Sequence, residues 1–110
     1  MKGLRKRRDF LAANRGKRAV MPGFILLMRK RGDEDPSIRF GVTVTRKIGG
    51  AVIRNRMKRR FRELARAILP GEGRPGADYV MIGRAGGVER DFGTLRNELA
   101  KAVAKLSRDG

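Results

Sequence analysis

The pattern of hydrophobic and polar side chains along the chain predicts three β-strands and allows a fourth, very short one. Residues 39–45 alternate strictly, with a bulky apolar side chain at every second position, which is typical of a strand with one buried face. Two apolar runs predict two more strands: residues 24–28, and residues 78–83, which are built on the apolar residues 79–82. Residues 19–21 are compatible with a very short fourth strand.

Apolar residues repeated at helical spacing predict three helices. The longest covers residues 51–69 and is ended by Pro70; its apolar side chains fall within an arc of about 80°. They are Ile53, Met57, Phe61, Leu64 and Ile68. A short first helix covers residues 9–14. A last helix is capped by Asp91, and its buried stripe is Phe92, Leu95, Leu99, Val103 and Leu106.

The order of these elements predicts an α+β fold. The strand at 39–45 and the strand at 78–83 are joined by the long helix, so they are parallel if they share a sheet. We therefore expect a small two-layer sandwich with a sheet backed by helices. A chain of 110 residues has room for one core, so residues 1–110 form a single domain. Residues 1–8 are expected to be a basic, flexible arm.

The face of the long helix opposite its apolar stripe is cationic. No acidic residue occurs from Arg46 to Arg62, whereas solvated surface helices usually mix both signs of charge. The net charge of the chain is +17, and residues 1–66 hold 21 Lys and Arg against 5 Asp and Glu, a net of +16. Because arginine offers a planar five-donor fork that suits phosphate, this gradient predicts a nucleic-acid partner. Basic content alone does not separate RNA from DNA.

The composition excludes several kinds of chemistry. The chain has no Cys and no His, which removes disulfides, thiol catalysis, Cys/His zinc sites and histidine general bases. Asp33, Glu34 and Asp35 lie between Gly32 and Pro36, which favours a solvated loop over a metal site. No apolar run reaches the ~18–20 residues of a membrane span, and no secretory signal follows the basic N-terminus. We expect a cytoplasmic protein that contacts no membrane and itself breaks no bonds.

One aromatic residue stands apart from the predicted core. Phe10 lies in the first helix among cations, where it either stacks on an unpaired base or packs in the core. The sequence leaves both roles open. Phe61 and Phe92 fit the buried stripes of helices, and Phe40 fits the buried face of a strand.

Four segments cover most of the chain: Asp9-Phe10 followed by Gly16, residues 40–49, residues 51–60 and residues 78–84. The most specific is residues 51–60, a helix with an Arg-Asn-Arg sequence at 54–56. Together these segments resemble the bacterial ribonuclease P protein family. The resemblance implies an α-β-β-β-α-β-α sandwich with a four-stranded sheet, in which the short run near Val20 is the fourth strand. It also implies a left-handed crossover around the Arg-Asn-Arg helix, against the strong right-handed preference of parallel strands.

The resemblance also implies a function. In this family the partner is a large catalytic RNA, which supplies the divalent-metal (Mg) chemistry and cleaves precursor tRNA to leave a mature 5′ end. The protein is then a non-catalytic subunit of an endoribonuclease, with no cofactor and no small-molecule substrate of its own. Its basic helix binds the catalytic RNA, and a cleft between the first helix and the sheet holds the 5′ leader of the precursor.

The family's functional residues map onto matching positions of this chain. The implied RNA contacts are Arg46, Lys47, Arg54, Asn55, Arg56, Lys58, Arg59, Arg60 and Arg62. Phe10 is the implied leader contact, with Phe24 as a second candidate. The family often has another aromatic residue one turn after Phe10, but this chain has Asn14 there, which reduces the expected stacking.

Two other classes remain as alternatives. A structural RNA-binding protein of ribosomal type has a similar charge, size and sandwich fold. Preference for precursor tRNA over mature tRNA, dependent on the leader, separates it from a ribonuclease P subunit. An architectural DNA-binding protein is the second alternative, but the sequence has no dimerisation heptad and no helix-turn-helix pattern.

Overall fold

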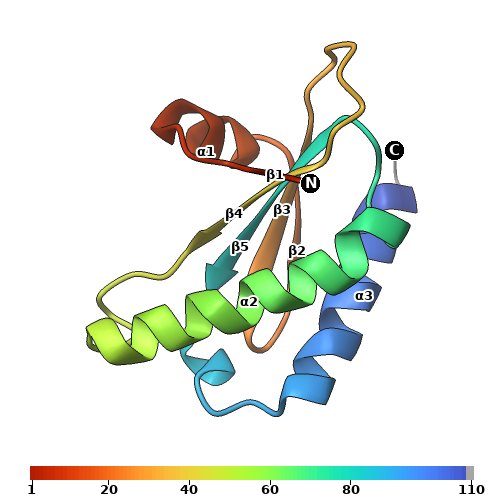
Figure 1. The fold of residues 1–110 in the computed structure, drawn as a ribbon. Helices are drawn as coiled ribbons and strands as arrows, with labels where there is room; N and C mark the ends of the chain where they lie inside the picture. Colours follow the sequence, from red (N-terminus) through yellow and green to blue (C-terminus); the bar gives the residue numbers. More distant parts are fainter. Residues whose placement is uncertain (109–110) are drawn as a thin grey trace.

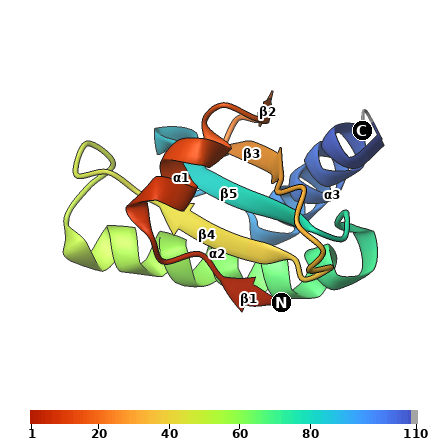
Figure 2. The same cartoon turned by 90° about the horizontal axis from the view of Figure 1, so that it is seen from above.

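The computed structural model describes residues 1–108 as a five-stranded mixed sheet with helices on both faces (Figures 1 and 2). The strands are β1 (Lys2–Gly3), β2 (Lys17–Val20), β3 (Phe24–Lys30), β4 (Arg39–Thr43) and β5 (Ala77–Gly83). The helices are α1 (Arg7–Ala13), α2 (Ala51–Glu72) and α3 (Phe92–Arg108), with a short 3-10 turn, η1 (Ala85–Gly87), before α3. The α+β prediction is confirmed.

The strand order across the sheet is β1-β4-β5-β3-β2. Strand β4 runs parallel to both β1 and β5, whereas β3 is antiparallel to both β5 and β2. The connection from β4 through α2 to β5 is left-handed, as expected from the resemblance (Figure 1). Helix α2 lies across the sheet (Figure 1). Exposed residues occur along its whole length, so its outer side is accessible to a partner.

The sheet separates two hydrophobic clusters. Helices α2 and α3 cover one face, where the larger cluster includes Phe24, Phe61 and Tyr79. Helix α1 packs on the other face over a smaller cluster that includes Leu27 and Val80. The two sets alternate along β3 and β5, as the period of two in a strand requires.

The first residues depart from the prediction of a flexible arm over residues 1–8. Lys2 and Gly3 form β1, which adds a fifth strand to the expected four. The Lys2 amide donates to the Ile38 carbonyl at 2.9 Å, and the Leu4 amide donates to the Phe40 carbonyl at 2.8 Å. Leu4 is buried. The physical reason is that β4 would otherwise be an edge strand with unpaired backbone groups.

The predicted helix phases hold except at the first turns. Met57, Phe61, Leu64 and Ile68 of α2 are buried, but Ile53 is 41% exposed because the first turn of α2 extends past the sheet (Figure 1). The other four residues of the α3 stripe are buried, whereas its first residue, Phe92, is 39% exposed. The predicted Asp91 cap is confirmed by the Thr94 amide, which donates to Asp91 Oδ2 at 3.0 Å.

Pro70 does not end the long helix, which continues to Glu72. A proline removes one donor and crowds the carbonyl four residues earlier, here that of Arg66. Because Pro70 lies in the last turn, only this one hydrogen bond is lost. The Gly73 amide still donates to the Leu69 carbonyl at 2.8 Å, which completes the turn.

Candidate nucleic-acid interface

Helix α2 and the turn before it present the predicted RNA contacts in two groups. Six of them are exposed, and none of their side chains makes a hydrogen bond or ion pair within residues 1–108. These are Arg46, Lys47, Asn55, Arg56, Arg59 and Arg62. The buried stripe of α2 lies on the opposite side of the helix, so these side chains are solvent-exposed, as the sequence pattern predicted. Their contact with RNA stays a prediction.

The other three predicted contacts, Arg54, Lys58 and Arg60, are half-buried. Arg54 Nε donates to the Gly49 carbonyl at 3.1 Å and so ties the start of α2 to the preceding turn. Arg60 turns toward the protein. Its Nη2 donates to the Arg90 carbonyl at 2.5 Å, and its guanidinium carbon lies 5.8 Å from the centre of the Phe92 ring. Arg60 therefore joins α2 to the segment before α3, a role that the sequence did not indicate.

Phe10 lines a cavity of about 540 Å³ between the N-terminal segment, β4 and α2, which we call the N-terminal cavity. Its walls combine apolar side chains with four cations. The lining residues are Met1, Lys2, Gly3, Leu4, Arg5, Phe10, Phe40, Gly41, Val42, Arg62 and Arg66. An aromatic ring among cations is the combination that unpaired nucleotides prefer. Neither Phe24 nor Asn14 lines this cavity.

A second hollow of about 500 Å³ lies along the outer side of α2 and shares two residues with the first. It is lined by Asn55, Arg59, Arg62, Glu63 and Arg66. Arg62 and Arg66 line both hollows, so the cationic side of α2 leads directly to Phe10. Arg66 was not among the predicted contacts, although its position on the polar side of the helix marked it as a candidate.

Phe24, the second predicted leader contact, is a core residue. Its side chain is fully buried, and its ring meets the Phe61 ring edge-on at a centroid distance of 5.9 Å. A fully buried ring is inaccessible to RNA, so this prediction is wrong. The physical reason is that Phe24 faces α2 and α3, whereas Phe10 lies on the opposite face of the sheet.

The ring of Phe10 packs directly on Gly41 of β4, where any larger side chain would force the ring to shift. A Cβ atom built on Gly41 lies 2.6 Å from Phe10 Cζ and 2.7 Å from Cε1, well inside van der Waals contact. The same atom would lie 3.0 Å from Leu4 Cβ. Gly41 is thus a part of the site that the alternation of β4 alone did not reveal.

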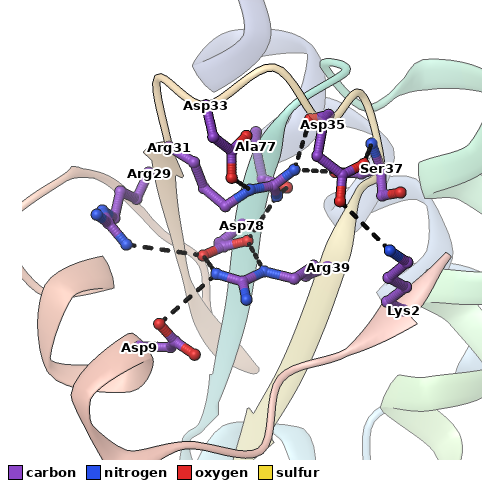
Figure 3. Close-up of polar contacts among 10 residues, drawn as sticks. All are labelled: Lys2, Asp9, Arg29, Arg31, Asp33, Asp35, Ser37, Arg39, Ala77 and Asp78. Atoms are coloured by element: carbon purple, nitrogen blue, oxygen red, sulfur yellow. Dashed lines mark hydrogen bonds and ion pairs between the residues drawn. The ribbon is translucent and has the colours of Figure 1, made fainter.

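An acidic residue that the sequence analysis missed organises the arginines beside α1 (Figure 3). Asp78, at the start of β5, is fully buried. Its Oδ1 accepts from Arg39 Nε at 2.7 Å and from Arg31 Nη1 at 2.8 Å, and its Oδ2 accepts from Arg39 Nη2 at 2.7 Å. Arg29 approaches Asp78 Oδ2 at 3.9 Å. The strand register explains the cluster, because Arg29, Asp78 and Arg39 are direct neighbours across β3, β5 and β4.

The Asp78 carboxyl is held in its charged form. Burial alone raises its pKa, but the hydrogen bonds and charges of Arg39 and Arg31 outweigh this effect and leave the pKa below its ordinary value. Arg31 is fixed in turn by the carbonyls of Asp35 and Ser37, at 2.8 and 2.6 Å. A buried carboxylate that accepts three arginine hydrogen bonds is a structural anchor, with no access to a substrate.

Residues 1–108 contain no cluster of acidic side chains that could hold a metal ion. None of the helices in this part of the chain is long and apolar enough to span a membrane. The arrangement is suited to binding a polyanion along α2 and an unpaired strand near Phe10.

Comparisons with known proteins agree with this geometry. A family model described as Ribonuclease P matches residues 1–107. The chain is 55% identical over 107 residues to the ribonuclease P protein component of Erythrobacter litoralis, covering 97% of this chain and 86% of that one. It is 46% identical over 106 residues to the corresponding protein of Caulobacter vibrioides, covering 96% and 71%.

Solved structures show the same fold. The ribonuclease P protein of Thermotoga maritima is 36% identical, with a TM-score of 0.78, and the match covers 98% of this chain and 97% of that one. The Staphylococcus aureus protein has a TM-score of 0.81 at 24% identity, covering 98% and 96%, and supports the fold alone.

Fold, charge and relatives define an RNA-binding subunit of a ribonucleoprotein nuclease. Its relatives are components of an endoribonuclease that processes tRNA. The chain belongs to the ribonuclease P protein family.

Proposed function

We propose that the cationic side of α2 binds the catalytic RNA of ribonuclease P and that the N-terminal cavity binds the 5′ leader of precursor tRNA. The observation that supports this most directly is the continuity of the two surfaces, since Arg62 and Arg66 line both hollows. A single-stranded RNA that runs from the cationic side of α2 to Phe10 would pass one acidic residue that lines the second hollow, Glu63.

The chemistry is assigned to the RNA. The catalytic RNA and the precursor are both polyanions, and a protein that carries +16 on residues 1–66 replaces the counterions between them. The catalytic RNA, not this chain, would hold the magnesium ions, and these would supply an activated water and charge stabilisation for cleavage. The protein raises the affinity for the substrate and lowers the metal concentration that cleavage requires. It acts in the cytoplasm, where transcripts are processed.

The test is a comparison of two positions on α1 in the reconstituted holoenzyme. Phe10→Ala removes the ring from the N-terminal cavity, whereas Leu11→Ala removes an exposed side chain of the same helix outside the cavity. Phe10→Ala should weaken binding of precursor tRNA by about 5- to 150-fold, the range for losing one base stack, and leave mature tRNA binding unchanged. Leu11→Ala should affect neither.

Two outcomes contradict the proposal. If Phe10→Ala lowers the melting temperature and weakens both tRNA forms equally, Phe10 is only a packing residue. If the wild-type holoenzyme binds precursor and mature tRNA equally well whatever the leader length, a structural RNA-binding role of ribosomal type is the better description.

A further inference from the structure

Helix α1 is held on the sheet by few apolar contacts. It has only seven residues, its N-cap Lys6 makes no side-chain capping bond, and Ala13 is its one fully buried residue. Phe10 is half-buried. A helix this short has little stability of its own, so its position depends on what fastens it to the sheet.

A chain of charges fastens α1 at its first turn (Figure 3). Asp9 Oδ1 lies 3.6 Å from Arg39 Nη2, the same nitrogen that donates to Asp78 Oδ2 at 2.7 Å. Because Arg39 also donates through Nε to Asp78, its guanidinium plane is fixed by two parallel bonds to a fully buried carboxylate. Asp9 therefore pairs with a cation that is already immobile, which reduces the side-chain entropy lost in forming the pair.

The ion pair and the ring contact are adjacent on both α1 and β4. Asp9 precedes Phe10 on α1, and Arg39 lies two positions before Gly41 on the same face of β4. Arg39 of β4 pairs with Asp9, and Gly41, the next residue on that face of β4, contacts the Phe10 ring. A shift of α1 along β4 would move the ring off Gly41.

We propose that Arg39, anchored on Asp78, is a positioning residue that holds the Phe10 ring in the N-terminal cavity through its ion pair with Asp9, and so sets the affinity for the leader. This inference rests on the proposed leader site. It assigns Asp9 and Arg39 no contact with RNA.

The central variant is Asp9→Asn, which preserves the size of the side chain and removes its charge. The charge change itself strengthens RNA binding in general, so Glu34→Gln serves as the matched control. Glu34 is exposed and has no partner among residues 1–108. The measured quantity is the ratio of precursor to mature tRNA affinity in the reconstituted holoenzyme, with a thermal melt of each variant.

We expect Asp9→Asn to lower this ratio by about 2- to 5-fold, the effect of a partly exposed ion pair, and Glu34→Gln to leave it unchanged. Asp9→Glu restores the charge and should keep the ratio near the wild-type value. In the Phe10→Ala background, Asp9→Asn should lower the ratio no further, because the ring that it positions is gone.

A second variant separates the ion pair from the effect of an acid at the start of a helix, which Asp9 also provides. Arg39→Lys keeps a cation beside Asp78, but an ammonium group cannot form the bidentate bond and reach Asp9 at once. It should lower the ratio as Asp9→Asn does. If Arg39→Lys leaves the ratio unchanged while Asp9→Asn lowers it, Asp9 acts only on its own helix and the inference is wrong.

Three further outcomes would contradict the positioning role of Arg39. If Phe10→Ala lowers the ratio but Asp9→Asn does not, the positioning role falls and the leader site stands. If Asp9→Asn lowers the ratio equally with and without Phe10, the two residues act independently and the positioning role again falls. If Phe10→Ala has no effect on the ratio, the leader site itself is wrong and this inference falls with it.

Discussion

The adjacent residues Arg59 and Arg60 should respond to alanine substitution in opposite ways. Arg59 is exposed on the outer side of α2 and lines the second hollow, with no partner among residues 1–108. Arg60 donates to the Arg90 carbonyl at 2.5 Å and lies over Phe92. Arg60→Ala should therefore lower the stability of the protein, whereas Arg59→Ala should lower its affinity for RNA.

The structure sets the sizes of both effects. A hydrogen bond from a charged group contributes about 1.5–3 kcal/mol, and a partly exposed cation–π contact about 0.5–1 kcal/mol. Because Arg60 is half-buried, we take the low end, about 2 kcal/mol, which lowers the melting temperature of a domain this size by roughly 8 °C. Arg59→Ala should move the melting temperature by less than about 2 °C, since alanine suits a helix.

The assay combines thermal melts with titration of the catalytic RNA at several salt concentrations. If Arg59 contacts one phosphate, its loss reduces the slope of log affinity against log salt by about 0.7–0.9. Arg60→Ala should leave that slope unchanged at temperatures where the variant is folded. A reduced slope in Arg60→Ala together with an unchanged slope in Arg59→Ala would refute the assignment of the two faces.

Three further predictions follow from buried residues. Phe61→Ala should cost about 3–5 kcal/mol in urea unfolding, and a melt like that of the wild type would show that Phe61 is not core. Gly41→Ala should cost about 1–3 kcal/mol by overpacking against Phe10, and much less in a Phe10→Ala background; an equal cost in both backgrounds contradicts the close approach. The depressed pKa of Asp78 adds stability that is complete above the unfolded carboxyl pKa of about 3.9 and is lost as the pH falls through the lower folded pKa. Urea midpoints between pH 6 and pH 3 should therefore fall less steeply in Asp78→Asn, which lacks this titration, and equal slopes would exclude the anchor.

The sequence alone was sufficient to predict the helices that span several turns. The α2 and α3 stripes contain enough turns for one face to be identified, and the cationic face follows from it. The prediction of buried residues was wrong in the first turn of each helix, at Ile53 and Phe92. A first turn can belong to the helix without lying over the sheet. Strand β1 has only two residues, so it has no readable period at all.

The candidate site was only partly predictable for a different reason. Asp78 and Gly41 act through partners on other strands, and strand register cannot be read from one sequence. Phe24 and Phe10 have the same side chain, and only the sheet decides that they lie on opposite faces. The left-handed crossover came from resemblance to a family, since general rules of chirality favour the other hand.

The position of β5 has a consequence for how the protein is made. It is the last strand in the sequence, yet it is the middle strand of the sheet, between β4 and β3. Within residues 1–108, only the short β1–β4 contact and the β2–β3 hairpin can pair before residues 77–83 leave the ribosome. The first 66 residues, with their net charge of +16, therefore cannot complete the sheet until β5 joins β4 to β3. Any RNA that this segment meets during synthesis can act as its first counterion, before the sheet exists to select a partner.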